Sequence, residues 1–204
     1  MPSESQIPAP RVPITEPEGR IVTREWFRFF NYVYEQILQL SASVSQLLIA
    51  ATPVYGAFHD MTSTSWTANT PSLVPLGVAD YMAGVTDGAS RVNILTAGLY
   101  TITASSQLTN ASTSNEDDIS LWLRVNSVDV PATASTVTVH KQHGGVPGSN
   151  LLTVNFFYLF AAGDYFELYG LSKLGYAQIV TYPAGTSPAY PAAPGTILTV
   201  AKIK

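Results

Sequence analysis

The sequence contains no cysteine, and only 12% of its 204 residues are charged. The absence of cysteine excludes disulfide bonds, thiolate metal ligands and cysteine nucleophiles, although it does not identify the redox compartment. The net charge of −4 provides no basic surface of the kind that binds nucleic acid. We therefore expect no nucleic-acid partner. So little charge on a chain of this length fits a protein that uses much of its surface for contacts between subunits.

The sequence also has no apolar run that predicts a secretion signal or a membrane span. The first 20 residues lack the apolar core of a secretory signal. The uncharged stretch of residues 36–58 is long enough to cross a bilayer, but three glutamines, three serines and Pro53 interrupt it. We expect neither a signal nor insertion into a membrane.

Catalytic motifs are absent as well. There is no G-x-S-x-G nucleophile elbow, no phosphate-binding loop with a lysine and no dinucleotide-binding G-x-G-x-x-G. His140 and His143 have H-x-x-H spacing, but residues three apart on a strand point to opposite faces, which favours a solvated loop over a metal site. The acidic sequence NEDD at residues 115–118 favours a turn, with a calcium site as the alternative. We therefore expect no enzyme activity, no cofactor and no metal.

The abundant residues predict an all-β protein. Glycine and proline number 14 each, and serine and threonine are frequent, which is typical of many short strands joined by turns. From about residue 54 apolar residues alternate with polar ones, as expected for a sandwich or jelly roll. The predicted strands cover residues 98–108, 119–125, 135–139, 151–160, 165–171, 177–182 and 196–203. Before them, residues 1–22 contain five closely spaced prolines and predict an extended arm that only a partner surface would order.

Between the arm and the strands, residues 23–52 predict a helix, with Thr23 as its N-cap and Pro53 as its stop. Its apolar residues follow a heptad, with Phe30, Ile37 and Val44 at a and Trp26, Val33, Leu40 and Leu47 at d. A coiled-coil core of Val33, Ile37, Leu40, Val44 and Leu47 is therefore predicted. A helix packed on its own domain, or one enclosed by partner protein, is the alternative. Because β-branched a and Leu d positions favour two strands, the helix alone does not specify a trimer.

The strands predicted over residues 165–171 and 196–203 carry apolar side chains on both faces. An antiparallel strand in a monomer normally has one face in water, so a second apolar face suggests a second partner. We predict that another copy of the chain is this partner, contacted through Tyr165, Tyr169, Leu198 and Val200. Packing of the second face against a neighbouring loop of the same chain is the alternative.

Three segments, in this order, resemble the C1q/TNF-like jelly-roll family: GLYTITASSQL, LWLRVNSVDV and LFAAGDYFELYGL. With VPITEPEGRIVTREWFRFF before them and TSPAYPAAPGTILTVAKI after them, nearly the whole chain resembles a group of tailed-bacteriophage virion proteins. The resemblance implies an extended arm at 1–22, an anchoring and trimerising helix at 23–52 and a jelly-roll domain at 53–204.

The resemblance also implies a function. The chain is expected to be a homotrimeric, non-enzymatic virion protein that is assembled in the host cytoplasm and exposed on the particle surface. A capsid decoration or head fibre bound to coat protein is the main expectation. A tail-associated fibre, bound to a tail component and contacting a host glycan or protein, is the alternative. The candidate host-binding aromatic residues are Trp66, Tyr81, Tyr176, Tyr182 and Tyr190, with ordinary packing within the domain as the favoured alternative for each.

The virion anchor is predicted at the start of the helix, where charged and aromatic residues are densest. Arginines there are expected to pair with acidic groups of the partner, while aromatic rings fill apolar pockets. The predicted anchor residues are Arg24, Trp26, Phe27, Arg28, Phe29 and Phe30.

Overall fold

The computed structural model describes Ile14 and residues 22–204, except for the side chains of residues 48–51. The chain divides into two compact units, Met1–Thr52 and Pro53–Lys204. Apart from Ile14 and Val22, the arm predicted over residues 1–22 lies outside the described residues.

The first unit contains the predicted helix as α1, Arg24–Ala51. The helix begins directly after Thr23, whose carbonyl accepts a hydrogen bond from the Phe27 N–H at 2.9 Å. The Thr23 N–H in turn donates to the Ile14 carbonyl, also at 2.9 Å. The helix ends two residues before Pro53, where proline cannot continue it. No helix in the described part of the chain is long and apolar enough to cross a membrane.

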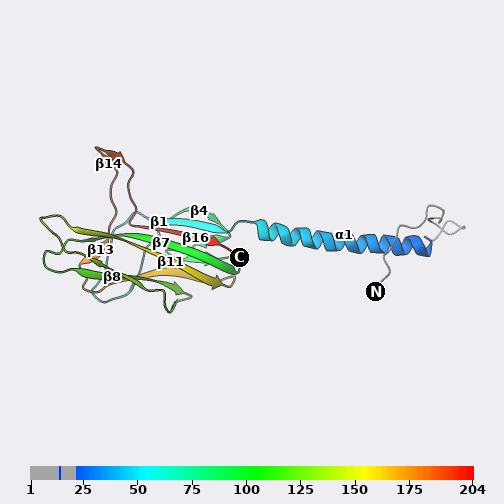
Figure 1. The fold of residues 1–204 in the computed structure, drawn as a ribbon, viewed down its shortest axis with the longest axis horizontal. Coiled ribbons are helices and arrows are strands. Elements are labelled where there is room, and N and C mark those ends of the chain that lie inside the picture. The colour runs from blue at the N-terminus through cyan, green and yellow to red at the C-terminus, as the bar shows by residue number, and fades with distance from the viewer. Residues whose placement is uncertain (1–13, 15–21) are drawn as a thin grey trace. The chain divides into compact units, whose positions relative to one another are not determined.

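The second unit is all-β, as predicted, and contains two seven-stranded sheets whose strand pairs are antiparallel. The strand order in the first sheet is β2 (Thr64–Ser65), β13 (Ala177–Ile179), β7 (Gly98–Asn110), β16 (Thr196–Lys202), β1 (Tyr55–Asp60) and β4 (Val78–Ala83). The seventh strand of this sheet, β11 (Gly148–Phe160), pairs with β7. The strand order in the second sheet is β10 (Ser135–Val139), β8 (Asp117–Val125), β12 (Tyr165–Ser172), β6 (Val92–Ile94) and β5 (Val85–Asp87). Two short strands complete this sheet: β3 (Ser72–Leu73) pairs with β12, and β9 (Val128–Asp129) pairs with β8. A separate hairpin joins β14 (Gly185–Thr186) and β15 (Ala189–Tyr190) (Figure 1).

The hydrophobic core lies between the two sheets, because each sheet turns one set of alternating side chains inward. On β7, Tyr100, Ile102 and Ala104 are fully buried, as the alternation predicts. On β8, Ile119 and Leu121 are buried in the same core. All seven predicted strands are present, with ends shifted by at most a few residues. The prediction of an all-β sandwich is confirmed at this level.

One predicted contact is wrong. Leu198 and Val200 on β16 are only 0% and 2% exposed, and they pack in the core of their own domain. They therefore have no surface to offer another copy of the chain. Ile197, on the opposite face of the strand, is 47% exposed. The alternation separated the two faces correctly, but it does not say which face points inward when both are apolar.

Candidate interaction surfaces

The outward surface of the first sheet carries no lysine, arginine, aspartate or glutamate across β1, β16, β7 and β11, and we call it the neutral face. The strand alternation and pairing register place the following side chains on it: Tyr55, Ala57 and His59; Ile197, Thr199 and Ala201; Thr101, Thr103, Ser105 and Gln107; Leu151, Thr153, Asn155, Phe157 and Leu159. An uncharged face of this extent is typical of a surface that is buried against protein.

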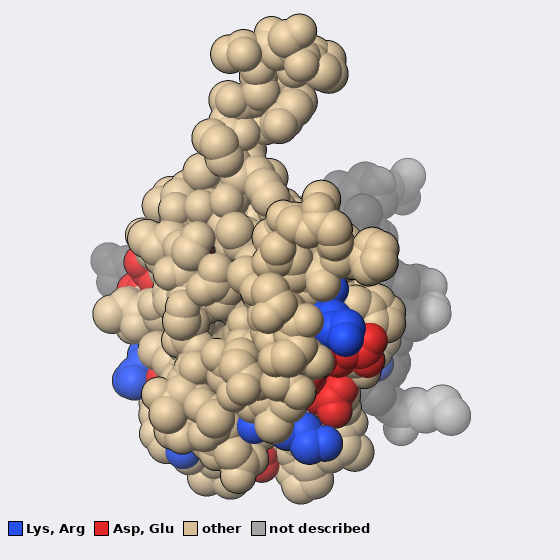
Figure 2. Space-filling view, turned by 90° about the vertical axis from the view of Figure 1, so that its left-hand side faces the viewer, with Lys and Arg blue, Asp and Glu red and all other residues tan. Residues whose placement is uncertain are grey.

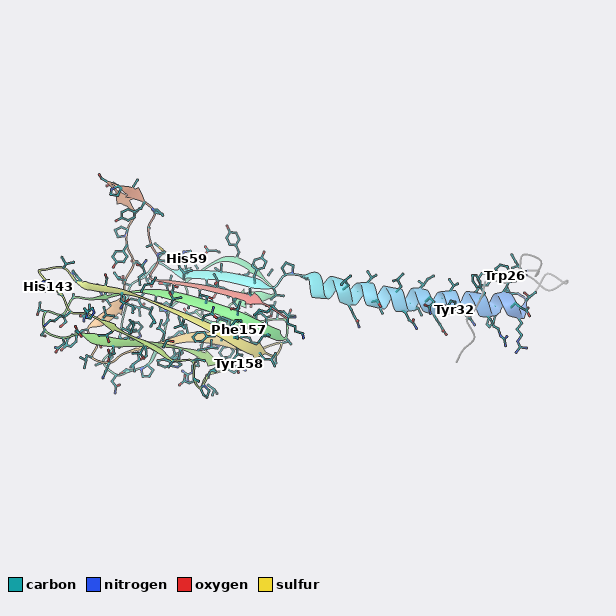
Figure 3. The ribbon with its side chains drawn as sticks, in the orientation of Figure 1. Trp26, Tyr32, His59, His143, Phe157 and Tyr158 are labelled. Atoms are coloured by element: carbon teal, nitrogen blue, oxygen red, sulfur yellow. The ribbon has the colours of Figure 1, made fainter. Side chains whose placement is uncertain are left out.

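Apolar side chains gather at the β11 edge of the neutral face. Phe157 and Leu159 are 67% and 73% exposed, and Figure 3 shows Phe157 on this strand. Farther along β11 the face becomes polar, with Asn155 donating to Thr103 at 2.6 Å and Ser105 bonded to Thr153 at 2.8 Å. These hydrogen bonds run between neighbouring strands of the same chain. They satisfy these polar groups within the chain, so the face can pack against another surface while these hydrogen bonds are kept.

Strand β11 is also an edge strand. It is 13 residues long and pairs with β7 along its whole length, and it has no second partner strand among those described. Its sequence, GSNLLTVNFFYLF, contains neither charge nor proline. Natural sheets usually protect long edges with charges, prolines or a covering segment, because an open edge invites pairing with another chain. This edge lacks the first two protections, which favours cover by another protein surface.

The outward surface of the second sheet is chemically different, because it is charged. Arg91 pairs with the buried Glu167 at 3.1 Å, and Lys173 pairs with Asp118 at 3.4 Å. The guanidinium groups of Arg91 and Arg124 lie over the rings of Tyr165 and Tyr169, at 4.2 and 4.4 Å from the ring centres. The chain's own arginines thus occupy one face of each tyrosine ring. The contact of these two tyrosines with another copy stays a prediction.

At the start of α1, three of the predicted anchor residues form an aromatic cluster. The ring centre of Trp26 lies 5.7 Å from that of Phe29 and 5.6 Å from that of Phe30, and Phe29 lies 5.9 Å from Phe30. Phe27 is exposed, and so are the other two predicted anchor residues, Arg24 and Arg28. The arrangement offers preorganised rings beside two positive charges, which suits a protein partner with an acidic rim.

Farther along α1, the predicted heptad positions form an apolar seam on the helix surface. Val33 is half-buried, and the remaining seam residues are exposed in the chain by itself: Ile37, Leu40, Val44 and Leu47. The described part of this unit therefore does not cover the seam. Apolar side chains at this spacing are buried when helices associate side by side.

The acidic sequence at residues 115–118 does not form one site, because its carboxylates have different partners. Glu116 bonds to His140 Nδ1 at 2.8 Å, whereas Asp118 accepts from Thr138 Oγ1 at 2.7 Å. Asp117 points into the domain and is buried. Among the described residues, no group of three or more histidine, aspartate or glutamate side chains is placed to hold a metal ion. The His143 backbone pairs with Val146 in a short loop.

Asp117 itself ties the start of β8 to the turn between β12 and β13. Its carboxylate accepts the Ser172 hydroxyl at 2.6 Å and the N–H groups of Leu174, Tyr176 and Ala177 at 2.8 to 2.9 Å. Burial by itself raises the pKa of Asp117, but these four hydrogen bonds favour the ionised form more strongly and hold its pKa below the ordinary value. The carboxylate therefore has a structural role, which sequence inspection did not identify.

Replacing Asp117 by Asn is expected to lower the free energy of unfolding by about 2 kcal/mol at pH 7, because the ionised acceptor is lost while its donors stay buried. Since the pKa is lowered in the folded state, the carboxylate stabilises the fold above pH of about 4 and loses this effect as pH falls through its folded pKa. Urea unfolding of both proteins at pH 7 and pH 3 should therefore show a smaller difference at pH 3. Asp118→Asn, one residue away, is the control; an equal loss in both variants would contradict the role.

The predicted host-binding aromatic residues divide into two groups. Trp66 is 5% exposed and belongs to the core, where it packs so close to Gly170 that a Cβ on that glycine would collide with the indole ring. Trp66 is therefore a packing residue, as the favoured alternative predicts, and not a candidate for ligand contact. Tyr81, Tyr176, Tyr182 and Tyr190 are exposed, although Tyr81 lies in strand β4 and not in a loop.

The chain matches no family model and no curated protein.

Proposed function

We propose that this chain is a non-enzymatic structural protein of a bacteriophage particle: a homotrimeric capsid decoration or head fibre displayed on the virion. Coat protein would be its partner, and the start of α1 would be its anchor. The second unit would be a C1q/TNF-like jelly roll, which is compatible with two antiparallel sheets that enclose one core. This proposal rests on the resemblance of the sequence and on the surfaces of the two units.

The observation that carries the proposal is the difference between the two outer faces of the β domain. The outward surface of the second sheet carries the ion pairs Arg91–Glu167 and Lys173–Asp118. The neutral face has no lysine, arginine, aspartate or glutamate of its own and exposes Phe157 and Leu159; its His59 contacts Asp80 of the neighbouring strand β4 at 2.9 Å. A monomer gains nothing from large apolar side chains on one open face. Burial of the neutral face between copies of the chain would remove this apolar surface from water.

The exposed seam of α1 supports the same arrangement. Ile37, Leu40 and Val44 would form successive layers of a short coiled coil. The helix by itself would favour two strands, so in this proposal the β domain selects three copies. The 28-residue helix is about 42 Å long at about 1.5 Å per residue. That length suits a short stalk better than a long tail fibre.

A tail-associated fibre is the second candidate, and exposed tyrosines favour it. Tyr176, Tyr182 and Tyr190 are 47%, 38% and 55% exposed, and none of them belongs to the hydrophobic core. Aromatic side chains with a free hydroxyl are frequent where proteins contact glycans or other proteins. In this alternative the β domain would contact the host surface and the anchor would bind a tail component.

Two measurements test the proposal. Light scattering coupled to size exclusion should give three times the chain mass of 21.9 kDa at micromolar concentration, because the seam and neutral face are buried only between copies. A stable monomer would overturn the architecture. Immunogold electron microscopy of purified particles, with antibody against the β domain, should then label the head. Label confined to the tail would favour the second candidate, and particles without label would overturn the virion assignment.

A further inference from the structure

A hairpin of residues 182–193 stands out from the β domain (Figure 1). We call this hairpin the arm; it is distinct from the extended N-terminal arm predicted over residues 1–22. At its root, Tyr182 and Ala193 exchange two backbone hydrogen bonds of 3.0 and 2.9 Å. At its tip, β14 pairs with β15. All of its residues except Gly185 and Ala193 are exposed, and none contributes to the hydrophobic core. The arm therefore gains almost no stability from its own domain.

The arm is uncharged and stiff. No charged residue occurs between Leu174 and Ala201, and Figure 2 shows the arm without a charged side chain, while the charges gather lower on that end of the domain. Three prolines restrict its backbone. The Tyr190 ring packs on Gly185 so closely that a Cβ there would collide with it, yet Tyr190 remains 55% exposed. A preorganised segment loses little conformational entropy when it docks.

The root of the arm lies at one end of the neutral face, where the chain enters β16. The Gly195 N–H donates to the Asp60 carbonyl at 2.9 Å, and the Gly195 carbonyl accepts from Gln107 at 2.8 Å, so the root is fixed between β1 and β7. A shallow hollow of about 320 Å³ lies beside it, lined by His59, Met61, Asp80, Ala192, Pro194 and Ile197. His59 and Ile197 belong to the neutral face. Figure 3 shows His59 below the arm.

The edge strand β11 lies on the other side of β7 from the root of the arm, because the order across the sheet is β4, β1, β16, β7 and β11 and the root continues into β16. On β11, Leu151 is exposed and lies opposite Gln107, at the same end of the sheet as the root of the arm. In a closed ring of identical copies, each copy uses two different surfaces. The first surface of one copy packs against the second surface of the next copy. The arm and β11 are two different surfaces of one copy, on either side of β7.

We propose that the arm of each copy clasps the next copy of this chain by packing on β11 around Leu151. This inference rests on the homotrimer proposed above. The two surfaces are complementary because both are uncharged and partly apolar, so neither leaves a charge buried without a partner. A host glycan is a poorer match, because the arm offers only hydroxyl groups and apolar side chains, without the amide or charged groups that fix a sugar's orientation.

Photo-crosslinking of the full-length chain tests the clasp. With benzoylphenylalanine in place of Tyr190, irradiation should join copies covalently, and peptide mapping should place the bond within residues 148–160. The same photoreactive residue in place of Val128, which is exposed on the second sheet, is the control and should give no bond between copies. Leu151→Arg combined with the Tyr190 probe should reduce crosslinking at least tenfold.

The outcomes separate the clasp from the trimer on which it rests. A particle of three chain masses that shows no bond between copies from the Tyr190 probe would overturn the clasp and leave the trimer standing. Bonds between copies that map outside residues 148–160 would overturn the choice of β11. A monomeric mass would overturn the trimer and, with it, the clasp.

Discussion

Replacing Leu40 by Glu is expected to dissociate the proposed trimer into monomers at micromolar concentration. Leu40 occupies a d position of the predicted heptad and is 65% exposed in the chain by itself. In a three-helix seam the substitution removes three buried leucines from one layer, which contribute about 5 to 9 kcal/mol together at about 1.5 to 3 kcal/mol each. It also brings three carboxylates together where water is excluded. Sedimentation velocity over a hundredfold range of concentration measures the effect.

Leu38→Glu is the matched control, because it changes the same residue type two positions away. Leu38 is 51% exposed and lies outside the a and d positions. We expect this variant to keep the mass of three chains. If both variants remain trimeric, the helix does not hold the copies together and the β domain alone is responsible. If both dissociate, the contact surface on α1 is not the heptad seam.

The long strands were predictable from sequence because their burial is one-sided. On β7 and β8 apolar and polar side chains alternate over nine residues or more, and each inward position is buried in the structure. The strands between residues 72 and 94 are two to six residues long and lie toward sheet margins. Short segments of this kind carry too little alternation to be recognised from sequence.

The interaction surfaces were predictable only in part, because a surface depends on what the whole sheet places side by side. Ile197 and Leu198 are equally apolar neighbours, and only the packing of the full sandwich buries one and exposes the other. The partners of Asp117 are 55 to 60 residues away in sequence, so the aspartate looked like part of an acidic turn. In hindsight, an aspartate that directly precedes a strongly alternating strand was the available signal.

Replacing Trp26 and Phe30 together by Ala is expected to abolish incorporation of the chain into virions. The two rings lie 5.6 Å apart and, with Phe29, form the only aromatic cluster among the described residues of α1. Buried aromatic anchors commonly contribute 2 kcal/mol or more each to a protein interface, so losing two weakens binding by about 10³-fold. The measurement is the ratio of this chain to coat protein in purified particles, assayed after infection in the presence of the variant alone.

Tyr32→Ala with Tyr34→Ala is the matched control, because it removes two exposed rings of the same helix that lie outside the cluster. Trp26 and Phe30 also occupy heptad positions, so the loss of incorporation has two explanations, a missing anchor or a missing trimer. The mass of the purified variant separates them. A trimer that no longer enters particles identifies the cluster as the anchor, whereas a monomer assigns these rings to the seam. Normal incorporation of the Trp26 and Phe30 variant would show that the chain is attached through other residues.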